Sequence, residues 1–550
     1  MGMGLSDLWY ENAIIYCLDV ETFNDSDGDG IGDFRGLTQK LDYLNSLGVT
    51  CIWLMPFFPT PNRDDGYDVA DFCSVDQRYG SIADFVEFTR EAAERGMRVI
   101  IDLVMNHTSN EHPWFQSARS SPDSPHRDFY VWRTDDPGDT SDQVVFPGKQ
   151  EGIWSFDDVA QAWYLHRFYD FQPDLNTANP AVRDELRRVI GLWLQLGVSG
   201  FRVDAAPFII NHVGVPENNY TSEPHLFIQH MRDVLSHHKG DAIFLAEVDE
   251  GPTIIAEYFG GGNEFQLLFN FLANRSLFLA LAEESADPLL SGLKDIPKVP
   301  DTGQWVNFLR HHDELNLSRL TEVQRQTVFK AFGADESLQV YGRGLRRRLA
   351  TMFGGNRKRL EMAYCLLFSL SGTPMLFYGE ELGMGENLDL PERMSVRTPM
   401  QWSAGQNGGY STAKPDDLVR PMVTTGKYGY RRVNVLDQRR DAGSLLNWMA
   451  QLIRARKECP EFGWGVGEPV STNAPTVYAQ RNEWSDGGVA VAVHNLSRQP
   501  CEVTLDLPAD EASQLLCLFA DATCNTADPV PPTFTLDGYG YRWFRVGGFR

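Results

Sequence analysis

The chain has 550 residues, 42% of them hydrophobic, and its 49 Lys and Arg residues against 75 Asp and Glu residues give a net charge of −26. This acidic balance argues against a nucleic acid or an anionic membrane as a partner. Because the sequence has neither a long apolar stretch that could span a membrane nor a basic start followed by an apolar run, we expect a cytoplasmic protein, large enough for one barrel and a smaller domain.

The cysteines are spread along the chain, without a CxxC pair that would suggest zinc or redox chemistry. They are Cys17, Cys51, Cys73, Cys365, Cys459, Cys501, Cys517 and Cys524. A buried free thiol behaves as a small apolar side chain. We expect all of them to be reduced, as is usual in a cytoplasmic enzyme.

The first predicted strand, residues 14–18, leads into a loop of alternating aspartates and glycines. Such a loop can fold its oxygens around one hard cation. The ligands would be Asp25, Asp27, Asp29, the carbonyl of Ile31 and Asp33. A solvated acidic turn is the alternative, but four aspartates at this spacing would repel one another strongly without a cation. The loop therefore predicts a structural calcium site.

The next two predicted strands are residues 50–54, followed by an acidic loop at 64–68, and residues 99–102. After the third strand the regular pattern stops from residue 108 to 172, in a segment rich in Pro, Asp, Ser, Trp and Tyr. A loop this long in a compact domain is usually a functional excursion or a lid. We therefore expect an inserted domain at this point.

The segment GFRV at residues 200–203 is predicted to be a short buried strand. Arg202 and Asp204 would lie on the same face of it, because side chains alternate along a strand. Taken alone, such a pair is most often a structural ion pair. Its neighbours in the sequence favour a functional role.

Two further strand-like runs also end in ionisable residues. Residues 242–246 precede Glu247, and residues 305–309 precede His312 and Asp313. Short apolar strands separated by helices predict a βα repeat. Charged residues at the carboxyl ends of several such strands are typical of the active site of a (β/α)₈ barrel.

The rest of the chain completes the barrel and adds a second domain. Residues 375–378 are predicted to form the eighth strand and 444–458 a closing helix, and β-branched runs beyond 460–463 predict an antiparallel β domain. The basic run at 342–350 is better explained by a helix face paired with carboxylates than by nucleic-acid binding. The predicted domains are a catalytic α/β barrel at 1–107 and 177–458, an inserted B domain at 108–176 and a C-terminal β-sandwich domain at 459–550.

Several segments resemble motifs of one enzyme family. In chain order they are RDDGYDVADF (63–72), DLVMNH (102–107), QPDLN (172–176), GFRVD (200–204), AEV around Glu247, HHD (311–313), RTPMQW (397–402) and YGYRRVNV (428–435). They are similar to the motifs of the α-amylase superfamily, glycoside hydrolase family 13, and QPDLN to that of its oligo-1,6-glucosidase and trehalose synthase members. The likeness runs from about Trp9 to the C-terminus.

The resemblance implies roles for three carboxylates. Cleaving an α-glucosidic bond with retention needs a nucleophile and a second carboxyl group that donates and then accepts a proton. Asp204 would be the nucleophile, Glu247 the acid/base and Asp313 the residue that stabilises the transition state. Arg202 would keep Asp204 ionised, because a neighbouring cation lowers the pKa of a carboxyl group.

Further contacts are implied by the same resemblance. Tyr67 would stack on the terminal glucose, and Asp68 and Arg397 would bind its outer hydroxyls. The same subsite would include His107, His312, Arg202 and Gln172. A second calcium would be held by Asn106, Asp174 and the carbonyls of Phe208 and Ile209. Asn211 stands where trehalose synthases have Glu, and the loss of a charge weakens such a site.

The expected activity is that of a trehalose synthase, which interconverts maltose and trehalose through a glucosyl-enzyme. An α-glucosidase that hydrolyses or transglucosylates small α-glucosides is the alternative, since the two differ in water exclusion and acceptor shape. His311, Val248–Glu250 and residues 18–21 depart from the family pattern at the rim, where they could alter the acceptor site. By the same resemblance, Ala205 beside Asp204 implies a preference for α-1,4 over α-1,6 linkages.

A catalytically silent, amylase-like scaffold is a third reading, and the presence of all three carboxylates argues against it. The implied partner is a small α-glucoside, and a homo-oligomer is compatible with the sequence.

Overall fold

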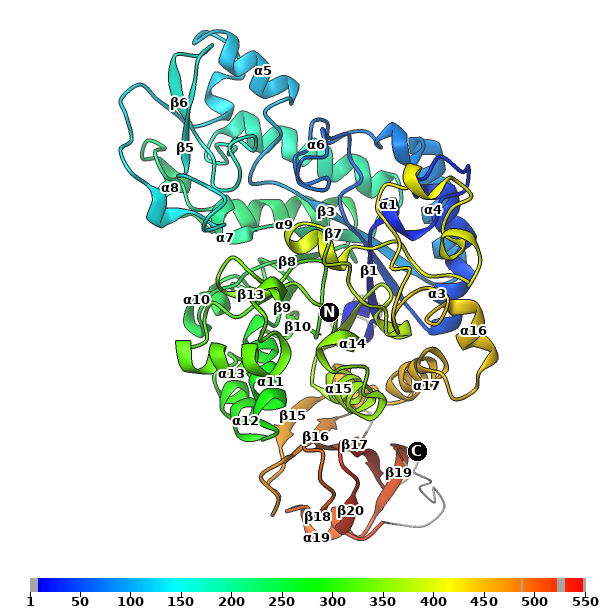
Figure 1. The fold of residues 1–550 in the computed structure, drawn as a ribbon. Coiled ribbons are helices and arrows are strands. Elements are labelled where there is room, and N and C mark those ends of the chain that lie inside the picture. Colours follow the sequence, from blue (N-terminus) through cyan, green and yellow to red (C-terminus); the bar gives the residue numbers. More distant parts are fainter. Residues whose placement is uncertain (1–7, 486–487, 522–529, 548–550) are drawn as a thin grey trace.

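Eight parallel strands close into a barrel at the centre of the molecule (Figure 1). The computed structural model describes residues 8–485, 488–521 and 530–547. Neighbouring strands are hydrogen-bonded in the order β1, β14, β10, β9, β8, β7, β3, β2, and the barrel closes where Ile15 pairs with Met375. The strands are β1 (Ile15–Leu18), β2 (Cys51–Leu54), β3 (Arg98–Leu103), β7 (Gly200–Val203), β8 (Ile243–Ala246), β9 (Leu267–Phe269), β10 (Gln304–Phe308) and β14 (Thr373–Phe377).

The barrel strands are short runs that are buried on both faces. All residues of β2 and β8 are buried, as expected for strands with side chains inside the barrel and helices outside it. Polar residues follow where the chain leaves this apolar interior. The carboxyl ends of the strands therefore collect ionisable side chains at one rim.

Amphipathic helices cover the outside of the barrel. A capping box between Ser81 and Asp84 begins α4, and its Phe85 packs edge-on against Trp193 of α6, with ring centroids 5.0 Å apart. The helices within the barrel part are α1 (Val20–Phe23), α2 (Phe34–Gln39), α3 (Leu41–Leu47), α4 (Ile82–Glu94), α6 (Pro180–Gln195), α7 (Ala206–Ile209), α8 (Asn219–Ser222), α9 (Leu226–His238), α10 (Pro252–Glu257), α11 (Phe271–Glu283), α12 (Asp287–Lys294), α13 (Glu322–Phe332), α14 (Leu349–Met352), α15 (Arg357–Ser369), α16 (Val435–Arg440) and α17 (Leu445–Lys457).

The insertion between β3 and α6 has a small sheet of its own. Its strands β4 (Trp132–Arg133), β5 (Trp154–Asp157) and β6 (Ala162–Leu165) pair antiparallel in the order β4, β6, β5. Phe115 of α5 (Pro113–Ser120) stacks on Trp132, with centroids 5.5 Å apart. Figure 1 shows this insertion (cyan) projecting from one side of the barrel.

The C-terminal part is an antiparallel sheet below the barrel (Figure 1). In spatial order its strands are β15 (Val466–Pro469), β16 (Val477–Trp484), β17 (Gly488–Asn495), β21 (Tyr541–Val546) and β19 (Leu515–Ala520), and β18 (Cys501–Thr504) pairs with β20 (Thr533–Leu536). Fully buried Trp543 packs on Phe462 of α18 (Glu461–Trp464), with centroids 4.9 Å apart. Some apolar residues of this sheet are thus continuous with those of the barrel, and the others form a separate cluster.

The remaining short elements lie in excursions. They are β11 (Leu315–Asn316), β12 (Gln339–Val340) and β13 (Gly344–Leu345), which form a three-stranded sheet, and α19 (Ala509–Ala512).

The fold class predicted from the sequence is confirmed: a (β/α)₈ barrel with an insertion after the third strand and a C-terminal antiparallel β domain. The sequence pattern did not predict β9, because only Asn270 separates its three residues from the apolar start of α11. The expectation of reduced thiols throughout is wrong, since Cys517 is disulfide-bonded. Among the described residues, none of the helices combines the length and the apolar character needed to cross a bilayer.

Candidate active site

Three carboxylates from the ends of separate barrel strands line one pocket of about 340 Å³. Asp204 follows β7, Glu247 follows β8, and Asp313 lies in the loop after β10. Because the carboxyl ends of parallel barrel strands meet at the same rim, residues far apart in sequence converge there. The structure therefore brings together the three residues expected to act on a sugar.

Arg202 connects two of these carboxylates. Its Nη1 donates to Asp204 Oδ1 (2.5 Å), and its Nη2 donates to Glu247 Oε2 (2.8 Å). Nη1 also donates to Asp102 Oδ1 (2.7 Å), a fully buried carboxylate that the sequence did not single out as a candidate. A guanidinium suits this position because it presents several donors in fixed directions.

Burial and neighbouring charges give the three acids different pKa values. Burial raises the pKa of Asp204 to about 6, although Arg202 opposes the rise. Burial likewise raises the pKa of Glu247 to about 7, opposed by Arg202 and reinforced by the other two carboxylates. Burial also acts to raise the pKa of Asp313, but His312, Arg393 and Arg397 hold it well below its usual value. One carboxyl group can therefore keep a proton near neutral pH beside ionised partners.

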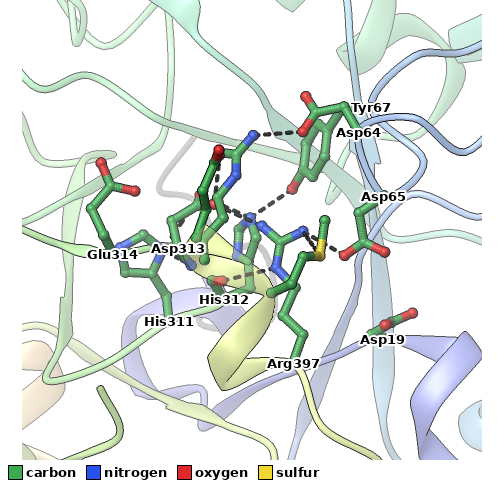
Figure 2. Close-up of polar contacts among 12 residues, drawn as sticks. Asp19, Asp64, Asp65, Tyr67, His311, His312, Asp313, Glu314 and Arg397 are labelled. Atoms are coloured by element: carbon green, nitrogen blue, oxygen red, sulfur yellow. Dashed lines mark hydrogen bonds and ion pairs between the residues drawn. The ribbon is translucent and has the colours of Figure 1, made fainter. Parts of the chain in front are cut away.

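Asp313 is held in one orientation by three side chains. His312 Nε2 lies 3.1 Å from Asp313 Oδ2, while Arg397 Nη2 (2.7 Å) and Arg393 Nη1 (2.9 Å) both donate to Oδ1. The two arginines come from the short helix η7 (Glu392–Val396) and the residue that ends it. Figure 2 shows Arg397 between Asp313 and Asp65.

Tyr67 and His107 line the pocket on the side of Asp313. The Tyr67 hydroxyl lies 2.7 Å from His312 Nε2, and their rings are parallel with centroids 5.8 Å apart (Figure 2). His107 Nε2 lies 3.1 Å from the Tyr67 carbonyl. Burial lowers the pKa of His107 to about 3 and that of His312 to about 4. Both imidazoles are therefore neutral at neutral pH.

Five of the residues expected to touch the sugar are not among those that line the pocket, namely Asp68, Arg202, His312, Arg397 and Gln172, and this corrects the expectation. Arg202 and His312 contact carboxylates that do line it. Asp68 is fully buried, and its carboxylate accepts the backbone N–H groups of Arg63 and Asp64, both at 3.1 Å. Arg397 is fully buried against Asp313. Gln172 is also fully buried and donates to Asp64 Oδ2 (2.9 Å). These side chains shape the pocket from behind its surface.

Asp64 and Arg393, from the same two segments as Asp68 and Arg397, line the pocket. Arg393 Nη2 donates to Asp64 Oδ1 (2.7 Å). The loop at 64–68 is acidic throughout, and its sequence does not reveal which carboxylate turns inward.

The other half of the pocket combines an apolar wall with a polar rim. Phe208 and Phe271 line it, together with His311. On the rim, Arg319 Nη2 donates to Glu250 Oε2 (2.7 Å) and to the carbonyl of Asp249 (2.6 Å). Two departures from the family pattern, His311 and the residues after Glu247, thus face the space next to the acid/base candidate.

The acidic loop after α1 brings together some of the ligands predicted for a cation, but not all of them. Asp25, Asp27 and Asp29 each offer a carboxylate oxygen within 4.8 Å of the other two. Asp33 instead caps α2, accepting the N–H groups of Gly36 and Ser26, both at 2.7 Å. Of the five predicted ligands, three carboxylates therefore gather, and hard oxygen donors of this kind suit calcium.

The second predicted cation set fits less well. Asn106 Nδ2 donates to Asp174 Oδ1 (3.1 Å), and burial raises the pKa of Asp174 to about 7. The carbonyl of Ile209 accepts the Thr177 hydroxyl (2.6 Å), and that of Phe208 accepts the Asn211 N–H (3.1 Å). These oxygens already have donors within the protein.

A barrel with three carboxylates in one pocket, two of them sharing an arginine, fits an enzyme that acts on glycosidic bonds. Residues 17–465 match the family model described as alpha amylase, catalytic domain, and residues 487–545 match the sucrose hydrolase-like, C-terminal domain. The chain belongs to the α-amylase family, glycoside hydrolase family 13, as its motifs indicated.

Individual relatives share nearly the whole length. The trehalose synthase/amylase TreS of Mycobacterium tuberculosis is 39% identical over 544 residues, covering 98% of this chain and 90% of that protein. The oligo-1,6-glucosidase of Bacillus cereus is 30% identical over 561 residues, covering 91% and 93%. The crystal structure of the trehalulose synthase MutB from Pseudomonas mesoacidophila MX-45 superposes with a TM-score of 0.78 at 25% identity, covering 99% and 100%. The chain is thus similar to glycosidases and isomerases of the family.

Proposed function

We propose that the protein is a trehalose synthase, which interconverts maltose and trehalose through a covalent glucosyl-enzyme on Asp204. The observation that carries this proposal is the lining of one pocket by Asp204, Glu247 and Asp313. Similarity to the trehalose synthase/amylase of Mycobacterium tuberculosis over 98% of the chain supports the substrate class.

The residues divide the first chemical step between them. An Asp204 oxygen attacks the anomeric carbon while the glycosidic C–O bond breaks, and Glu247 gives its proton to the leaving oxygen. Both carboxylates reach one guanidinium, which supports the close spacing used by retaining enzymes over the wider spacing of inverting ones. Asp313, ionised among its donors, stabilises the positive charge that develops on the sugar ring.

The second step decides the product. In isomerisation a different hydroxyl of the released glucose attacks the anomeric carbon, gives its proton to Glu247 and frees Asp204. This outcome requires that the glucose stay in place and that water stay out. A volume of about 340 Å³, walled by Phe146, Phe168, Phe208 and Phe271, supports retention of a single small acceptor.

Hydrolysis or transglucosylation of small α-glucosides is a second candidate function. It is favoured by the polar rim beside Glu247, where the side chains of Asp249, Glu250 and Arg319 are 22%, 29% and 39% exposed. Water can reach the acceptor half of the pocket along this rim.

The two candidates are separated by incubating the purified protein with maltose and, separately, with trehalose. Interconversion with little free glucose supports the isomerase, whereas mostly glucose from both sugars contradicts it. Asp204→Ala is the inactive control. Mass spectrometry after reaction with a 5-fluoro-α-glucosyl fluoride tests the covalent step, because the label should remain on the peptide that contains Asp204.

We propose calcium binding only at the loop that contains Asp25, Asp27 and Asp29. Burial raises the pKa of Asp29, and its acidic neighbours add to the rise, so a cation would relieve repulsion there. Its role would be structural, because Asp33 of the same loop caps α2.

A further inference from the structure

Asp19, Glu21 and Asp65 form a buried acidic cluster behind the pocket. Each offers a carboxylate oxygen within 4.8 Å of the other two, and the residues are only 5%, 1% and 8% exposed. Asp19 and Glu21 belong to the stretch 18–21 at the rim of the first strand, which departs from the family pattern. Three carboxylates so close and so buried cannot all ionise without a cation.

Arg420 supplies that cation from a distant segment. Its Nη2 donates to Glu21 Oε2 (2.7 Å) and to Asp65, and its Nη1 lies 3.6 Å from Asp19 Oδ2. The side chain is 9% exposed. The segment that carries it is anchored on the acidic loop, where the Val419 N–H donates to the Gly30 carbonyl (3.0 Å).

The same guanidinium also reaches the support of Asp313. Arg420 Nη1 donates to the backbone carbonyl of Arg397 (2.9 Å). Asp65, which Arg420 binds, is itself an ion partner of Arg397, and Arg397 Nη2 donates to Asp313 Oδ1 (2.7 Å; Figure 2). Arg420 therefore holds both the main chain and the counter-ion of the arginine that orients Asp313.

We propose that Arg420 is a positioning residue for the reaction, which acts on Asp313 through Asp65 and Arg397. This inference rests on the proposed function, because its effect is measured as cleavage of an α-glucoside. Without Arg420, Asp65 would have Arg397 as its main cation and would draw that guanidinium away from Asp313. A displacement of about 1 Å at a reacting group can cost a hundredfold in rate.

The competing explanation is that Arg420 only balances the charge of the acidic cluster. Variants of the chain can separate this charge-balancing role from the positioning role. Arg420→Leu removes the cation that contacts all three acids of the cluster, whereas the double variant Glu21→Gln/Arg420→Leu restores the net charge. Arg78→Gln is the matched control, because Arg78 binds the other oxygen of Glu21 (Nη1 to Oε1, 3.3 Å) and its second partner is Asp76.

The test measures kcat/KM for p-nitrophenyl α-glucoside together with the melting temperature. We expect kcat/KM to fall by about tenfold to a hundredfold in the double variant, even though its melting temperature recovers towards wild type, and to stay within about threefold in Arg78→Gln. Wild-type kcat/KM in the double variant would overturn the inference. If that variant does not fold, Arg420→Lys replaces it, because it keeps the charge but lacks the forked donors, and the same loss of kcat/KM is expected.

A crystal structure of the double variant separates this inference from the proposed function. Displacement of the Arg397 guanidinium from Asp313 supports the positioning role, and an unchanged Arg397 contradicts it, whatever substrate the enzyme uses. A wild-type protein that cleaves no α-glucoside would defeat the proposed function and leave the crystallographic result to decide the role of Arg420.

Discussion

The acid and the nucleophile of the pocket are the same kind of group, and their surroundings make them different. Asp204 and Glu247 share Arg202, and burial raises the pKa of both. Glu247 has the higher pKa, of about 7 against about 6. Because the two groups interact, these values describe the pair as it titrates.

This order predicts a bell-shaped dependence of kcat/KM on pH. Activity should rise through about pH 6 as Asp204 ionises and fall above about pH 7 as Glu247 loses its proton. Glu247→Gln should remove the alkaline limb and lower kcat/KM on maltose by roughly 10² to 10⁴. Profiles of both proteins check this, and an alkaline limb that persists in the variant would contradict the assignment of Glu247.

A conservative change at Arg202 should not be tolerated. Arg202→Lys keeps the charge but cannot serve Asp102, Asp204 and Glu247 at once. Each lost hydrogen bond to a buried charged group is worth about 1.5–3 kcal/mol, so we expect a clearly lower melting temperature and about a hundredfold loss of kcat/KM. Arg188→Lys, on a side chain that is 72% exposed, is the control and should behave as wild type.

The sequence pattern located Asp204 and Glu247, because an apolar run stops just before each of them and the structure ends a barrel strand there. Asp313 lies further along, in the loop after β10, and was singled out by the family resemblance. The pocket-lining pair Asp64 and Arg393 was missed, because loop backbone geometry decides which side chain turns inward, and residue spacing does not encode that geometry.

At the scale of elements, burial on both faces made most of the barrel strands recognisable as short apolar runs. β9 was the exception, since no polar boundary separates it from the apolar face of α11. The structure of the acidic loop depends on local charge and turn geometry. Its sequence suggested a cation site, but the role of Asp33 as the N-cap of α2 became visible only in the structure, which shows where α2 begins.

Removal of calcium should loosen this acidic loop. If the ion is present at a hundred times its dissociation constant, it stabilises the fold by about 2.7 kcal/mol. We therefore expect EDTA to lower the melting temperature by a few degrees and calcium to restore it. Asp27→Asn should weaken this dependence, and Asp416→Asn, an exposed acid outside the cluster, should not. The same melting temperature with and without EDTA would contradict a calcium site.

At the scale of the whole molecule, the C-terminal sheet and the barrel form one packed unit. Trp543 lies against Phe462, and Trp448 Nε1 of α17 donates to the Tyr541 hydroxyl (2.8 Å). Because the apolar cluster of the barrel continues into this sheet, the two parts should lose structure together.

Trp543→Ala tests this coupling. We expect this substitution to lower the free energy of unfolding by about 3–5 kcal/mol. The unfolding temperature, measured by calorimetry, and the temperature at which activity is lost, measured as residual activity, should fall by equal amounts. Val466→Ala, at a residue that is 71% exposed, should change neither. An active barrel that survives separate melting of the sheet would contradict the coupling.

The pairing of Glu21 with Arg420 spans 399 residues and therefore has a consequence for biosynthesis. A ribosome adding about 5–20 residues per second needs roughly 20–80 s to travel from one partner to the other. Throughout that interval the nascent chain carries acids that will later be buried against Arg420, which has not yet been made, and β1 lacks its neighbour β14. The catalytic end of the barrel thus has to mature late, after most of the chain has left the exit tunnel.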